Sequence, residues 1–182
     1  ANTSGGNITY PSASSGPVRT LILTPSGATI PSLNGAAQVK VDGTNYAYYV
    51  LDFDADTAQS TFWSWTMPNS YDGGTVNVTY YWEAAATTGS AVWCFQSIGV
   101  PANGTQGVDS PLGAAVCATS AAPGSANYLT SVVQSNAVSN FAAGQYIAFK
   151  VYRDATNASD TMTGNARLVK VTIGYHVNNE SD

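Results

Sequence analysis

The chain has 182 residues, a length that fits one domain. Only 9% of the residues are charged, the net charge is -5, and the six basic residues are scattered singly along the chain. These features argue against nucleic acid as a partner, because clustered Lys and Arg supply affinity for phosphates. No apolar run approaches the ~18 residues of a membrane span.

Residues 1–17 are rich in Gly, Ser and Pro and show no apolar periodicity. Such a composition buries too little apolar surface to fold alone. We therefore expect an extended N-terminal arm that docks on a neighbouring subunit. Its expected contact residues are Asn7, Ile8, Tyr10 and Pro11.

After the arm, short apolar stretches alternate with turn residues. The predicted strands cover 18–24, 37–41, 46–53, 60–67, 75–83, 91–100, 114–120, 128–135, 145–153 and 166–177. Strands at this spacing favour a two-sheet sandwich, and eight or more of them favour a jelly roll. The sequence therefore predicts an all-β fold, an antiparallel two-sheet β-sandwich of jelly-roll type, formed by residues 18–182 as a single domain.

The stretch "TFWSWTMPNSYDGGTVNVTYYWEA", residues 61–84, holds three of the four tryptophans. Its two predicted strands are joined by a Gly-containing turn, which indicates an aromatic hairpin. Strict alternation on the second strand predicts a sheet with one buried face. The residues of that face are Val76, Val78, Tyr80 and Trp82.

Two aromatic residues of this stretch lie on the opposite faces of their strands. Phe62 lies opposite Trp63 and Trp65 on the first strand, and Tyr81 points outward from the second. A strand that is apolar on both faces is covered on both sides or meets a partner. We therefore expect Phe62 and Tyr81 at a subunit interface.

Residues suited to catalysis are scarce. His176 is the single histidine, and the sequence has no G-x-S-x-G motif for a nucleophile. Glycoside hydrolysis needs two carboxylates across a cleft. Asp52 and Glu83 could pair, yet acids at strand ends are usually turn or solvent residues. The sequence therefore predicts a protein that is not an enzyme and has no cofactor.

The two cysteines, Cys94 and Cys117, lie in predicted neighbouring strands. A disulfide is one interpretation. A pair of buried thiols is the interpretation that we favour, because buried free Cys is common. The redox compartment stays undecided.

Three acids alternate in "LDFDADT", at Asp52, Asp54 and Asp56. Carboxylates on one side of a strand could share a calcium ion. However, the Gly and the later Glu of an EF-hand loop are absent. We favour a turn that contains Asp54 and Asp56, since Asp is a turn former, and keep a weak calcium site as the alternative.

Four charges gather between two apolar β runs near the C-terminus, at Arg153, Asp154, Asp160 and Arg167. Arg suits bidentate contact with a carboxylate. We predict a structural salt-bridge cluster in this loop and not a binding site. An exposed pair there would stabilise the fold by only ~0–1 kcal/mol.

The ordered succession "LDFD", "FWSWTMPNSYDGGTVNVTYYWEA", "GSAVWCFQSIGV" and "YRDATNASDTMTGNARLVKVTIGY" resembles virion structural proteins of tailed bacteriophages. The likeness covers about residues 46–175 and does not extend to the arm. It implies a jelly-roll domain on the phage surface, used in capsid decoration or in a tail fibre. It implies no catalytic residues.

Two functions follow from this resemblance. The main expectation is a capsid decoration, or cement, protein on the capsid surface of the virion. It would form a homotrimer that binds the major capsid protein, and repetition over the lattice would add avidity. The alternative is a tail-fibre or receptor-binding domain that recognises host-surface glycans and exposes Trp and Tyr in a groove.

Overall fold

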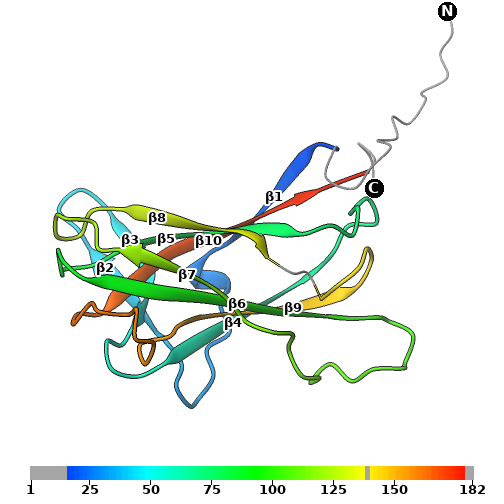
Figure 1. The fold of residues 1–182 in the computed structure, drawn as a ribbon, viewed down its shortest axis with the longest axis horizontal. Helices are drawn as coiled ribbons and strands as arrows, with labels where there is room; N and C mark the ends of the chain where they lie inside the picture. Colours follow the sequence, from blue (N-terminus) through cyan, green and yellow to red (C-terminus); the bar gives the residue numbers. More distant parts are fainter. Residues whose placement is uncertain (1–15, 138–139, 179–182) are drawn as a thin grey trace, which may run out of the picture.

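The computed structural model describes residues 16–137 and 140–178, which form ten strands and one short 3-10 helix. Figure 1 shows the strands in two facing layers, with β8, β5 and β10 in one and β6, β9 and β4 in the other. The strands are β1 (Val18–Leu23), β2 (Ala37–Asp42), β3 (Ala47–Phe53), β4 (Gln59–Thr66), β5 (Val76–Glu83), β6 (Ser90–Val100), β7 (Val116–Ala121), β8 (Thr130–Ala137), β9 (Tyr146–Arg153) and β10 (Ala166–His176); the helix η1 is Pro25–Gly27.

One layer is a six-stranded sheet in the order β2-β3-β10-β5-β8, in which β1 also pairs with β10. The other is a four-stranded sheet in the order β4-β9-β6-β7. All pairs of neighbouring strands are antiparallel, and most neighbours are distant in sequence, as in the crossed connections of a jelly roll. The predicted all-β jelly-roll sandwich is confirmed.

The core between the sheets is aromatic. Val76, Val78, Tyr80 and Trp82 are buried on the inner face of β5, as their alternation predicts. From the opposite sheet, Trp93 stacks on Tyr80 and meets Trp82 edge to face, with ring centroids 5.9 Å apart in both pairs. Such contacts add to the free energy of burying apolar area. Most of the tryptophan side-chain surface is therefore packed in the core.

The predicted aromatic hairpin is wrong. β4 belongs to the four-stranded sheet and pairs with β9, whereas β5 belongs to the six-stranded sheet and pairs with β10 and β8. Residues 67–75 connect the two sheets. This connection is longer than the roughly 2–5 residues that fix a hairpin. The apolar faces of the two strands therefore meet across the core and not within one sheet.

The preference for two buried thiols is also wrong. Cys94 of β6 and Cys117 of β7 form a disulfide, and they are direct partners in the strand register, with Cα atoms 4.1 Å apart. The sequence placed them in neighbouring strands, but only the register shows that they lie directly opposite. The bridge closes the long β6–β7 connection, which Figure 1 shows extending beyond the sheets.

The N-terminal arm falls mostly outside the described residues, which begin at Gly16. The end of β10 holds the described start, because the Val177 amide donates to the Pro17 carbonyl at 3.1 Å. His176 Nδ1 lies 3.0 Å from the carbonyl oxygen of Gly16. Domain boundaries at residues 17 and 18 stay a prediction. Among the described residues, no helix has the length and apolarity needed to cross a membrane.

Candidate functional site

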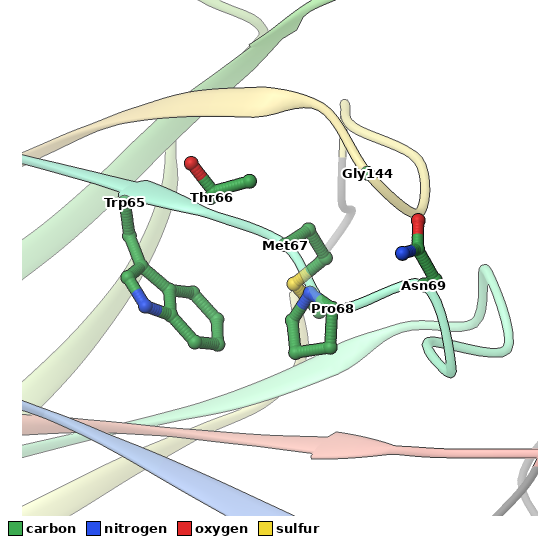
Figure 2. Close-up of a pocket in the computed structure, with 6 residues that line it drawn as sticks. All are labelled: Trp65, Thr66, Met67, Pro68, Asn69 and Gly144. Carbon is green, nitrogen blue, oxygen red and sulfur yellow. The ribbon is translucent and has the colours of Figure 1, made fainter. Parts of the chain in front are cut away.

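A pocket of about 440 Å³ lies where β4 ends. We call it the Trp65 pocket; it is lined by Trp65, Thr66, Met67, Pro68, Asn69 and Gly144. In Figure 2, Trp65 and Pro68 project from the same side of the chain, and Asn69 lies at the far end beside Gly144. None of these six described residues carries a charge. The pocket therefore offers rings, backbone groups and neutral side chains to a ligand.

Two backbone hydrogen bonds hold the walls of the Trp65 pocket together. The Met67 amide donates to the Gln145 carbonyl, and the Gly144 amide donates to the Met67 carbonyl, both at 2.9 Å. Gly144 has a φ of 72°, and a Cβ there would lie 2.9 Å from Asn69 Oδ1. A glycine is required because a left-handed backbone and a tight approach coincide. The position of this rim is thus fixed by backbone hydrogen bonds and by a required glycine.

The tryptophans of the first aromatic strand have different environments. Trp63 is buried, and its Nε1 donates to the Thr24 carbonyl at 2.9 Å. Trp65 is half-buried and rests against Tyr175, with ring centroids 5.7 Å apart. Tyr175 in turn contacts Tyr71. Trp65 is therefore an aromatic surface that is supported from behind and open to the pocket.

A second pocket, of about 280 Å³, lies near the end of β5. We call it the Tyr46 pocket; it is lined by Tyr46, Tyr48, Glu83, Asn127, Leu129 and Val169. Tyr46 is 71% exposed and Leu129 is 61% exposed. The Tyr46 and Tyr48 rings contact each other with centroids 5.4 Å apart. These side chains come from β3 and the residue before it, from β5 and β10, and from the segment before β8, so only the fold assembles them.

The floor of the Tyr46 pocket contains a buried carboxylate. The Glu83 side chain is 5% exposed, and the Tyr48 hydroxyl lies 3.1 Å from Oε1 and 3.0 Å from Oε2. Burial raises the pKa of Tyr48, and the hydrogen bond to Glu83 raises it further. Arg167 lies behind, with Nη1 3.9 Å from Glu83 Oε1 and Nε 3.8 Å from Asp52 Oδ1. One guanidinium is thus shared by two carboxylates.

The structure brings Asp52 and Glu83 to the same place, but both face Arg167. Asp52 Oδ2 also accepts a hydrogen bond from Asn165 at 3.3 Å. A general acid must keep a proton while its partner stays ionised. Here both carboxylates lie beside the same guanidinium. The arrangement is therefore that of an ion-pair group.

The weak calcium site has no support in the described residues, among which no three His, Cys, Asp or Glu gather to hold a metal. Asp54 Oδ1 accepts from the amides of Asp56 and Thr57 at 2.8 and 2.9 Å. These bonds lower the pKa of Asp54. Asp56 is exposed, and Asp52 faces Arg167. Asp54 thus closes a turn, the interpretation that the sequence favoured.

The predicted charge cluster divides into separate parts. Arg153 and Asp160 form a buried pair, with Nη2 2.7 Å from Oδ1 and Nε 2.9 Å from Oδ2. Asp154 instead accepts from Thr156 and Asn157 within its own loop. Arg167 joins Asp52 and Glu83 on the outer face of the other sheet. The Arg153–Asp160 pair is buried and not exposed, so removing one partner would leave the other charge buried without a counter-charge.

The predicted interface residues are only partly described. Asn7, Ile8, Tyr10 and Pro11 lie outside the described residues. Phe62 is half-buried on the outer face of the four-stranded sheet. Tyr81 is half-buried on the outer face of the six-stranded sheet, under the Lys170 ammonium at 4.4 Å. Their role at an interface stays a prediction.

Most residues of both pockets could not be predicted from the sequence. Alternation in "NYAYYVLDF" was a usable signal, since it puts Tyr46 and Tyr48 on the same face as Asp52. No local pattern joins Asn127 or Leu129 to that face. Likewise, no pattern brings Gly144 to Asn69, because the chain segments are far apart in sequence.

No protein-family model and no curated protein matches this sequence. Among solved structures, a family 35 carbohydrate-binding module from Clostridium thermocellum is similar, with 15% identity, a TM-score of 0.50, and coverage of 85% of this chain and 97% of that one. CBM35 from Cellvibrio japonicus Abf62 has 11% identity, a TM-score of 0.48, and coverage of 88% and 99%. Tailspike protein 4 of bacteriophage CBA120 has 8% identity, a TM-score of 0.40, and coverage of 84% and 19%. The first likeness shows a shared fold and nothing more, and the other two are too distant to support an argument. The chain thus shares its jelly-roll β-sandwich fold with the family 35 module.

Proposed function

We propose that this protein is a non-catalytic module that binds a neutral glycan in the Trp65 pocket. The observation that carries the proposal is the half-buried Trp65 ring, supported by Tyr175 and open to an uncharged pocket. A pyranose ring has one face of C–H groups that packs on such a ring, and its hydroxyls seek polar groups around it. The exposed Asn69 amide provides such a group at the rim.

The pocket suits a neutral sugar because no charged side chain lines it that could pair with a charged ligand. An ionised ligand would lose hydration without gaining an ion pair. The size also fits, since small-ligand pockets measure about 300–1,000 Å³. Carbohydrate binding by the family 35 module of the same fold is compatible with this proposal. The fold does not determine function, so the geometry of the pocket remains the argument.

The disulfide adds support for a glycan-facing location. Disulfides such as Cys94–Cys117 persist in oxidising surroundings outside the cytosol. Cell-surface glycans are met in the same surroundings. A tail-fibre or receptor-binding domain on a phage particle, exposed to host glycans, is the setting that we propose for the module.

The strength of binding can be estimated from one ring. Trp65 is half-buried and packs against Tyr175, so only part of the ~150–250 Å² of a tryptophan side chain is open to a sugar, about 40 Å². At ~25 cal/mol per Å² this contributes about 1 kcal/mol, or about 5-fold in Kd. We therefore expect Trp65→Ala to weaken glycan binding about 5-fold.

The test is a glycan array with the full chain, followed by NMR titration with the neutral oligosaccharides that give a signal. Resonances of Thr66, Asn69 and Gly144 should shift. Asn69→Ala alters only the exposed rim and should weaken binding without unfolding the domain. Phe62→Ala, on the outer face of the four-stranded sheet, is the matched aromatic control and should bind normally. Unchanged binding by both Trp65→Ala and Asn69→Ala, or no neutral glycan bound at all, would contradict the proposal.

A further inference from the structure

We infer that the Tyr46 pocket is a second, separate site, which takes a small ligand carrying an ammonium group, such as a saccharide with a free amine. It differs from the Trp65 pocket in one decisive respect, because a carboxylate forms its floor. Glu83 lines the pocket although its side chain is only 5% exposed. A buried charge is costly unless it is paired.

The existing partners of Glu83 leave room for a further cation. The Tyr48 hydroxyl supplies one hydrogen, which is shared between the two oxygens. An ionised carboxylate offers about four lone-pair positions, so the single Tyr48 hydrogen does not occupy them all. The remaining partner, Arg167, lies at 3.9 Å, beyond ordinary hydrogen-bond distance.

Charge in this region favours a positive ligand. Asp52, Glu83 and Arg167 carry two negative charges and one positive charge, which leaves the group at -1. The Lys170 ammonium, on β10, is engaged with the Tyr81 ring, whose centroid lies 4.4 Å away. An anionic ligand would meet the Glu83 carboxylate at the floor, and a neutral ligand would leave the excess charge unbalanced.

The walls of the pocket suit an ammonium group carried on an organic body. Tyr46 and Tyr48 contact each other at one side, and the faces of tyrosine rings attract cations. Leu129 and Val169 add apolar surface to the lining. The Asn127 amide donates from its backbone to the Ala84 carbonyl at 2.7 Å, which fixes this loop over the end of β5. Tyrosine rings, apolar walls and a deep carboxylate together match a cation with C–H groups around it.

The test compares three sugars that differ at one position: glucosamine, N-acetylglucosamine and glucose. In an NMR titration of the full chain, glucosamine should shift the resonances of residues 46–48 and 127–129. Its Kd from these shifts should be at least tenfold lower than that of either neutral sugar. Raising the salt concentration should weaken glucosamine binding, because an ionic contact contributes.

Two variants distinguish binding in the Tyr46 pocket from nonspecific binding elsewhere on the surface. Glu83→Gln should abolish the tenfold preference for glucosamine. Because Glu83 is buried and its substitution could unfold the domain, Tyr46→Ala provides a second test at an exposed side chain and should weaken glucosamine binding severalfold. Asp109→Asn, an exposed acid in the β6–β7 connection, is the matched control and should have no effect.

The outcome is independent of the Trp65 pocket. Trp65→Ala should leave glucosamine binding unchanged. If no neutral glycan binds in the Trp65 pocket, the inference about the Tyr46 pocket still stands. Equal affinity for glucosamine and glucose at residues 46–48 would overturn it. A glucosamine preference that survives both Glu83→Gln and Tyr46→Ala would overturn it as well.

Discussion

Replacing Asp160 by Asn tests the energetic role of the buried ion pair. Arg153 and Asp160 have side chains that are 0% and 1% exposed. The guanidinium also donates to the carbonyls of Met162 and Gly164, both at 2.7 Å. Asp160 Oδ2 accepts from the Val92 amide at 2.9 Å. One Arg thus ties the 154–165 loop to the end of β9.

Asp160→Asn keeps the shape but removes the negative charge and one acceptor. Its amide nitrogen would point at an N–H group of Arg153 or Val92, and the guanidinium would be left buried without a counter-charge. Breaking a buried pair in this way costs about 3–5 kcal/mol. For a chain of this size, about 1 kcal/mol shifts Tm by ~2–4 °C, so Tm should fall by roughly 6–20 °C.

Urea denaturation and calorimetry measure the loss directly. Asp109→Asn, an exposed acid, is the control and should change the free energy of unfolding by no more than about 0.5 kcal/mol. Replacing both partners by apolar residues, Arg153→Met with Asp160→Leu, should cost less than the sum of the single changes, because no charge is stranded. A loss below about 1 kcal/mol for Asp160→Asn would refute the reasoning.

Three further predictions concern the disulfide, the buried tyrosines and the arm. Replacing Cys94 and Cys117 by Ala should lower the free energy of unfolding by about 3 kcal/mol, since the bridge closes a loop of 23 residues; an unchanged denaturant midpoint would contradict this. Burial raises the pKa of Tyr80 and of Tyr48, so in an ultraviolet titration both should ionise later than an exposed tyrosine. Because the unfolded chain releases these protons first, stability should fall as the pH rises above about 10; a single ionisation step near pH 10 for all tyrosines would exclude the effect. If the protein decorates a capsid as a trimer on the major capsid protein, deleting residues 1–17 should abolish occupancy on particles while circular dichroism of the domain stays the same. Full occupancy of the shortened protein would reject the arm as an anchor.

Much of the fold could be predicted because strand patterns are local. The alternation of Val76, Val78, Tyr80 and Trp82 identified a buried face correctly, since successive side chains of a strand point to opposite sides. Asp54 was assigned to a turn for an equally local reason, because its carboxylate bonds amides two and three residues ahead.

The candidate sites depend on information that no local pattern contains. Alternation reports which side chains share a face, but it does not report which strand lies beside which. Strand order placed β4 and β5 in different sheets and left Trp65 open beside Gly144. Register placed Cys94 directly opposite Cys117.

The sequence by itself determined the class of the fold, the buried faces of its strands and the scarcity of catalytic groups. Only the tertiary structure decided which polar groups meet. Arg167 pairs with two acids from different strands, Asp52 and Glu83, although its neighbours in sequence suggested Arg153 and Asp160 as companions. The physical reason is that pairing in a sheet brings residues far apart in sequence side by side, and Arg167 is the register partner of both Asp52 and Glu83.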